Sequence, residues 1–122
     1  MIAHLVLFAP RPDLTRQDED GLALALERAA REIPTVRAAR VGRRVRHGAG
    51  YEAPASADFP YFVLLEFDDL AGLRAYLDHP GHLDLAARFY QTLREARVFD
   101  YDIGDVSLIR GWLEDRGRGP EV

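Results

Sequence analysis

Two short segments of this chain are apolar on both faces of the strand that each would form. Residues 2–9 (IAHLVLFA) and 61–67 (YFVLLEF) are rich in branched and aromatic side chains and are bounded by prolines or acidic turn residues, as buried strands are. Alternate residues of a strand point to opposite sides, and neither alternate set of these segments is polar. A fold for this chain must therefore cover both sides of its central strands.

The sequence between these segments predicts a helix that ends at Pro34. It follows Thr15-Arg16-Gln17-Asp18, which resembles a capping box. Its apolar stripe consists of Leu22, Leu26, Ala29 and Ile33. Further strands are predicted at 36–46 and 97–103, with a loop rich in small residues at 47–60.

A second helical region follows the segment 61–67. Asp68 or Asp69 caps a short helix that carries Tyr76, and Pro80 is suited to the first position of another helix capped near Asp78 or His79. The stripe expected to pack on the sheet consists of His82, Ala86, Phe89 and Leu93.

This order of elements predicts an α+β fold of the ferredoxin-like type. Strand, helix, strand, strand, helix pair and strand form a β-α-β-β-α-β antiparallel sheet with helices on one face. The other face would be an apolar patch larger than monomers normally expose. A second copy around a twofold axis covers it, so we predict a homodimer, a dimeric α/β barrel joined through the sheet face.

The predicted domain spans residues 1–104, and residues 105–122 form an extension. Four apolar side chains of the extension group on one side of a helical turn, and they are expected to dock on the same or the partner subunit. They are Leu108, Ile109, Trp112 and Leu113. Beyond Glu114 the sequence is polar and glycine-rich, which predicts fraying.

Composition excludes several kinds of chemistry. The 122 residues include no cysteine and no lysine, which removes disulfides, thiol nucleophiles and lysine Schiff bases. The net charge of −4 gives no reason to bind nucleic acid or an anionic membrane, and the first apolar run is too short to span a bilayer. A cytoplasmic protein without a metal or an organic cofactor is expected.

Three residues are candidates for acid–base chemistry. His4 shares a strand face with Val6 and Phe8, His82 lies on the helix stripe expected to pack on that face, and Tyr76 precedes it. Histidine is the usual general acid or base near neutral pH, and a phenol can orient a carbonyl group. The spacing leaves a second interpretation open, in which both histidines are core residues satisfied by the backbone and Tyr76 only packs.

Four motifs together resemble the stress-responsive α/β-barrel (Dabb) family over about residues 1–103. They are HLVLF at 4–8, IPTV at 33–36, LEF at 65–67 and YLDHPGH at 76–82. The resemblance implies homodimers of ferredoxin-like subunits. In a plant polyketide cyclase of this family, the tyrosine and the second histidine of the last motif act as the acid–base pair, supported by the N-terminal histidine. Carried over, these are Tyr76, His82 and His4.

The resemblance also implies where a ligand and a metal would lie. A hydrophobic, carbonyl-containing small molecule would contact Val6, Phe8, Leu22, Leu26 and Phe89. The cyclase has aromatic residues on its first helix where this chain has Leu22, Ala23 and Leu26, which changes the shape of such a pocket. Some plant members bind magnesium through backbone carbonyls, which would fall near Ala30, Ile33 and Val36.

Other functions remain open at this stage. The alternatives are a non-catalytic stress-related dimer with structural histidines and a haem- or flavin-free monooxygenase of the related dimeric barrels, and a shared fold does not decide between them. His79 and His82 are spaced for a metal but have no third ligand. Five arginines form a run with two interpretations, a site for an anionic group or a solvated edge strand. They are Arg37, Arg40, Arg43, Arg44 and Arg46.

Overall fold

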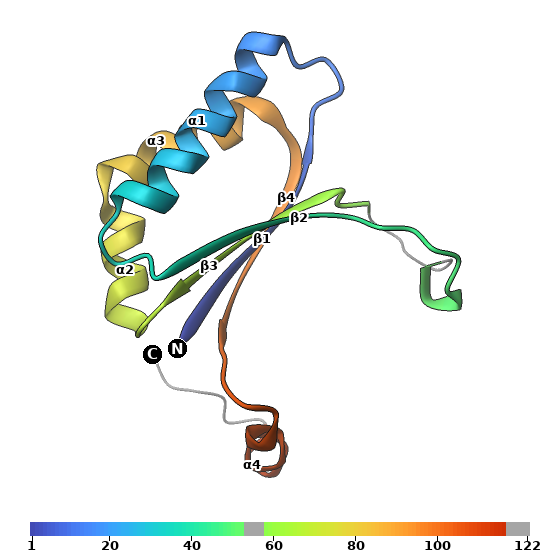
Figure 1. Ribbon diagram of the computed structural model, residues 1–122, viewed down its shortest axis with the longest axis vertical. Coiled ribbons are helices and arrows are strands. Elements are labelled where there is room, and N and C mark those ends of the chain that lie inside the picture. Colours follow the sequence, from blue (N-terminus) through green and yellow to red (C-terminus); the bar gives the residue numbers. More distant parts are fainter. Residues whose placement is uncertain (53–57, 117–122) are drawn as a thin grey trace.

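The computed structural model describes residues 1–52 and 58–116 and contains one four-stranded antiparallel sheet. Its order is β2-β3-β1-β4. The strands are β1 (Ile2–Pro10), β2 (Ala38–Arg43), β3 (Tyr61–Phe67) and β4 (Leu93–Asp102). The helices α1 (Arg16–Glu32), α2 (Leu70–Asp78) and α3 (Pro80–Thr92) lie on one side of the sheet (Figure 1). The ferredoxin-like prediction is confirmed.

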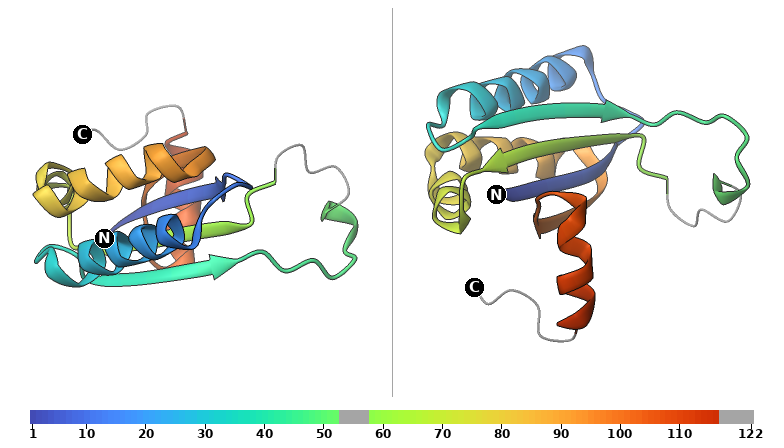
Figure 2. Two further views of the ribbon diagram at one scale, coloured as in Figure 1. Left: turned by 90° about the horizontal axis from the view of Figure 1, so that it is seen from above. Right: turned by 60° about the horizontal axis from the view of Figure 1, so that its bottom comes forward.

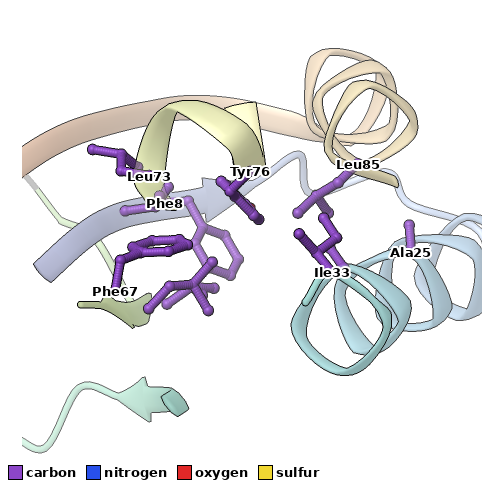
Figure 3. Packing of buried hydrophobic residues seen from close by; sticks show 11 residues of the cluster. Phe8, Ala25, Ile33, Phe67, Leu73, Tyr76 and Leu85 are labelled. Carbon is purple, nitrogen blue, oxygen red and sulfur yellow. The ribbon is translucent and has the colours of Figure 1, made fainter. Parts of the chain in front are cut away.

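The core lies between the helices and the even-numbered face of β1. In the β1–β3 register, His4 is opposite Leu65 and Val6 is opposite Val63, so the buried residues of both strands share this face. Figure 3 shows Phe8, Phe67 and Tyr76 together in this layer. The buried cluster consists of Val6, Phe8, Ala25, Ala29, Ile33, Val63, Leu65, Phe67, Leu73, Tyr76 and Leu85.

The helix stripes differ from the predicted ones by a fraction of a turn. Ala25 is buried in α1 instead of Leu22 and Leu26, which are only partly buried. In α3 the buried residue is Leu85, and Ala86 is exposed. These two helices pack against each other, and alanines at the contact allow close approach of their backbones. The leucines of α1 consequently lie at the border of the core.

The predicted helix caps are confirmed. Thr15 and Asp18 form both hydrogen bonds of a capping box, and the Asp69 carboxylate accepts a hydrogen bond from the Gly72 amide at 2.8 Å. His79 caps α3 and accepts a hydrogen bond from the Gly81 amide on Nδ1 at 2.9 Å, with Pro80 at the first helical position. These caps explain why α2 and α3 begin where they do.

Two predicted strands have wrong boundaries. Strand β2 is shorter than 36–46, and β4 begins at Leu93 rather than at residue 97. Leu93 therefore belongs to a strand and not to the helix stripe, because residues 93–96 pair with the end of β1 beside a register shift at Ala9 and Pro10. Within the predicted loop 47–60 a short turn, η1 (Gly50–Glu52), forms, and residues 53–57 lie outside the described part.

The second face of the sheet is apolar at its centre, and no helix of the described residues packs against it. Leu5 is opposite Leu64 on β3 and Phe99 on β4, and Leu7 is opposite Phe62. The Phe62 ring lies over Gly42 of β2, where any Cβ would collide with it. We call this side the open face. It lies where the sequence predicted an apolar patch on the side of the sheet without helices.

Beyond the sheet, the chain forms a turn η2 (Val106–Leu108) and a short helix α4 (Ile109–Glu114). Figure 1 shows α4 on the side of the sheet opposite α1 and α3, and the right-hand view of Figure 2 shows it standing apart from the strands. The fraying predicted after Glu114 falls largely on residues 117–122, which lie outside the described part. In the described part of the chain, no helix has the length and apolar character needed to cross a membrane.

Candidate functional site

The structure brings His4, Tyr76 and His82 together between the sheet and the helices. Tyr76 contacts both histidines, with ring centroids 5.8 Å from His4 and 4.7 Å from His82. His4 comes from the middle strand β1, Tyr76 from α2 and His82 from the first turn of α3. The chain reverses at the His79–Pro80 cap between α2 and α3, and this turn places Tyr76 beside His82. The convergence predicted from strand and helix faces is present.

A fourth residue, Asp100, joins this group from β4. Asp100 lies directly across from His4 in the β1–β4 register, and His4 Nδ1 donates a hydrogen bond to Asp100 Oδ1 at 2.6 Å. A carboxylate that accepts from Nδ1 fixes the tautomer and leaves Nε2 with a lone pair. The sequence analysis did not include Asp100 among the candidate residues. Its alternation with Phe99 was the available signal, because it puts Asp100 on the helix-covered face.

His82 is held as a neutral base. Its Nδ1 donates a hydrogen bond to the Leu77 carbonyl at 3.0 Å, which leaves Nε2 as the lone-pair nitrogen. Partial burial lowers the pKa of His82 below its usual value. The Leu77 hydrogen bond opposes this effect, and His4 adds to it when the His4 ring is protonated. At neutral pH the ring is therefore uncharged and able to accept a proton.

Tyr76 is a neutral hydrogen-bond donor. It is 2% exposed, and burial raises its pKa to about 12. Its ring also packs on Phe67, 5.3 Å away between centroids. Among the described residues, no protein group forms a hydrogen bond with the Tyr76 hydroxyl or with Nε2 of either histidine. Three polar atoms of one cluster are thus left without a partner from the protein.

The raised pKa predicts how alkali destabilises the fold. A tyrosine that ionises near 10 when unfolded and at about 12 when folded contributes full stability below pH 10 and loses it as the pH rises to 12. Tyr76→Phe should remove about 2 kcal/mol of this alkaline loss, measured by urea unfolding between pH 9 and 12. Equal slopes in wild type and variant would contradict the assignment.

The predicted ligand-contacting residues lie beside the cluster. Val6 and Phe8 belong to the buried core, and Leu22, Leu26 and Phe89 pack against it. The rings of Phe8 and Phe89 contact each other, with centroids 5.4 Å apart. The contact between the two phenylalanines lies in the same buried core to which Tyr76 belongs.

The other candidate features lie outside the cluster. His79 serves as a helix cap, and within the described residues no group of three or more His, Asp or Glu side chains is arranged to hold a metal ion. The Ile33 carbonyl accepts a hydrogen bond from the Val36 amide at 3.2 Å. Together with Ala30, these residues would offer a magnesium ion backbone carbonyl groups but no charged ligand.

The arginine run is largely paired with carboxylates. Arg37 forms an ion pair with Asp68 at 2.8 Å, and Arg44 and Arg46 share Asp58 at 3.3 and 3.2 Å. All three pairs involve exposed or half-exposed side chains, whose contribution to stability is small. This pattern favours the interpretation of the run as a solvated strand edge over that of an anion site.

Fold and cluster together define a small ferredoxin-like α+β protein with a histidine–tyrosine cluster under its helices. The family model of the Stress responsive A/B Barrel Domain (Dabb) matches residues 2–103. The chain therefore belongs to the Dabb family. The match ends just before η2, so α4 lies outside the family domain. No curated protein matches the sequence.

Solved structures of the same fold include proteins with and without a known activity. A dimeric ferredoxin-like protein of unknown function from Thermobifida fusca is 22% identical, with a TM-score of 0.65, and the match covers 84% of this chain and 90% of that one. A Dabb family protein from Mesorhizobium loti is 21% identical (TM-score 0.67; 85% and 97% covered). The hydroxynitrile lyase of Passiflora edulis is 18% identical (TM-score 0.72; 86% and 94% covered).

Proposed function

We propose that this protein is a homodimer joined through its open face. The support is the apolar surface of β1, β3 and β4 that no helix covers, with Leu5, Leu64 and Phe99 at its centre. A twofold axis buries the same surface of both subunits at once. The Thermobifida fusca neighbour is also dimeric. In this arrangement the histidine–tyrosine cluster lies on the other side of the sheet, so each subunit has its own site.

We further propose that the cluster catalyses proton transfer at a hydrophobic carbonyl compound, as a cyclase or lyase without an organic cofactor does. His82 Nε2 takes a proton from the carbon beside the carbonyl group. The electron pair of the broken C–H bond moves to the carbonyl oxygen, and the Tyr76 hydroxyl donates a hydrogen bond to this oxygen. His4, oriented by Asp100, holds a second lone-pair nitrogen at the cluster.

One observation carries this proposal. Each histidine uses Nδ1 for a bond to the protein, and the two Nε2 atoms and the Tyr76 hydroxyl have no partner among the described residues. Core histidines that serve only packing are normally satisfied at the buried end of the ring. The neighbouring hydroxynitrile lyase is named for a carbon–carbon lyase, which agrees with the class of reaction.

The test is hydrogen exchange in heavy water, followed by proton NMR. Benzylacetone, a hydrophobic methyl ketone, serves as the probe, and the wild-type protein should accelerate exchange of its protons beside the carbonyl. Tyr76→Phe removes the donor to the developing oxyanion and should lower the accelerated rate by about 10²-fold. Tyr90→Phe, on an exposed tyrosine of α3, is the matched control and should leave the rate unchanged.

The alternative is a non-catalytic dimer with structural histidines. Two observations favour it: the Leu77 carbonyl satisfies one nitrogen of His82, and Tyr76 is packed in the buried core against Phe67. It predicts no acceleration of exchange by the wild type with benzylacetone or with a series of longer aryl ketones. It also predicts equal behaviour of Tyr76→Phe and Tyr90→Phe at neutral pH.

A further inference from the structure

The extension after β4 ends in an exposed apolar surface that its own subunit does not cover. We call Val106–Glu114 the arm. Its large apolar side chains are Val106 (83% exposed), Leu108 (45%), Ile109 (50%), Trp112 (45%) and Leu113 (56%). The helix α4 has six residues, and helices shorter than about 12 residues are marginal in water without outside packing. The main packing contacts of α4 are with η2, the turn before it.

The direction of the arm is set by local hydrogen bonds. The Ile103 amide extends the β1–β4 pairing by donating to the Met1 carbonyl at 2.9 Å. Asp105 then caps the turn, because its carboxylate accepts from the Ser107 amide at 3.0 Å. The Leu108 side chain folds back onto Gly104, where a Cβ would meet it. The arm therefore leaves the sheet at a defined angle.

This angle takes the arm to the side of the open face. Figures 1 and 2 show α4 beyond the sheet on the side opposite α1 and α3. The odd-numbered residues of β4 that precede it, Phe99 and Tyr101, are exposed on the open face. Ile109, Trp112 and Leu113 have the i, i+3 and i+4 spacing of one helix face. An apolar surface thus continues from the open face along β4 to the arm.

We infer that the arm packs on a second copy of this chain and extends the proposed dimer interface beyond the family domain. This inference rests on the proposed dimer. One partner subunit would cover the open face and the arm together, because the two surfaces are continuous and lie on the same side of the sheet. The arm carries charges of both signs, with Arg110 beside Glu114, and so lacks the cationic face that binds anionic membranes.

The sole tryptophan makes this inference directly measurable. Sedimentation velocity gives the dimer fraction, and acrylamide quenching of Trp112 emission reports its accessibility in the same samples. In the dimer, Trp112 should be quenched several-fold less than N-acetyltryptophanamide. Leu5→Asp, in the centre of the open face, weakens the dimer and allows dilution to monomer. Quenching of Trp112 in that variant should rise in step with dissociation.

A matched pair of variants tests the contribution of the arm. Leu113→Asp on α4 should raise the dimer Kd by about tenfold or more and expose Trp112. Leu24→Asp, on an exposed leucine of α1 (48%), should change neither quantity. Thermal unfolding of both variants, at a concentration where each has the same dimer fraction, controls for loss of folding.

The possible outcomes distinguish a failure of the arm inference from a failure of the dimer proposal. A dimer in which Trp112 is quenched like the free compound, with the Kd unchanged by Leu113→Asp, overturns the arm inference and leaves the dimer intact. Equal protection of Trp112 in monomer and dimer overturns it as well, because the arm would then cover its own subunit. A wild-type protein that sediments as a monomer overturns both proposals.

Discussion

His82→Gln is expected to lower the ketone exchange rate by about 10²–10⁴-fold, the range that a positioned general base contributes. Glutamine keeps an N–H donor for the Leu77 carbonyl, which His82 holds at 3.0 Å, so the local hydrogen bond can survive. It has no nitrogen that accepts a proton near neutral pH. The fold should therefore persist while the reaction is lost, measured by proton NMR and by urea unfolding of the same sample.

The pH dependence gives a second measurement on this variant. Burial lowers the pKa of His82, so the wild-type exchange rate should hold at neutral pH and fall on the acid side of 6.5. The free energy of unfolding should fall in the same range, because a lowered histidine pKa means that protonation favours the unfolded chain. Both losses should be weaker in His82→Gln.

His47→Gln is the control for this prediction, since His47 is an exposed histidine near η1. It should leave rate and stability unchanged. The non-catalytic alternative predicts a different result for His82→Gln: an exchange rate equal to that of the wild type, together with a lower unfolding free energy because the packing of the imidazole ring is lost.

Leu5→Asp is expected to have the largest effect on assembly. Leu5 lies on the central strand with Leu64 and Phe99 as its cross-strand neighbours, and a carboxylate there would be buried without a partner in the dimer. Burying an unpaired charge at an interface costs about 3–5 kcal/mol, which corresponds to a Kd about 10²–10⁴-fold higher. Sedimentation velocity over a dilution series measures this change.

The helix side of the sheet provides the comparison. Leu24→Asp adds the same charge at an exposed leucine on α1 and should leave the Kd as it is. Far-UV circular dichroism should be unchanged in both variants, because neither residue belongs to the buried cluster. If Leu5→Asp left a folded dimer with its original Kd, the open face would not be the interface.

The fold was predictable because its signals are local. The short apolar runs 2–9 and 61–67 and the caps at Thr15 and Asp69 are each defined by a few neighbouring residues, and the order of the elements leaves one simple topology. The junction of α3 and β4 was not predictable in the same way. No glycine or proline lies near the junction of Thr92 and Leu93. Only the pairing with β1 determines where the helix ends and the strand begins.

The candidate site was predictable in part for the same reason. His4, Tyr76 and His82 follow from strand and helix faces, and the structure brings them together as expected. Asp100 was missed because its partner His4 is 96 positions away. The residue pattern of each strand alone does not determine the register between two strands that are distant in sequence. The alternation of residues in β4 indicated that Asp100 is on the helix-covered face, but it did not indicate that His4 lies opposite Asp100.

The four polar residues of the cluster come from β1, α2, α3 and β4, and none comes from α1. The helix α1 instead contributes Leu22 and Leu26, which pack at the border of the core. For protein engineering, this separates selectivity from chemistry. Under the proposed function, a library that varies Leu22 and Leu26 would change the apolar border of the core while the residues proposed to transfer protons keep their own backbone support. The helix α1 is therefore the element at which new ligand preferences should be sought.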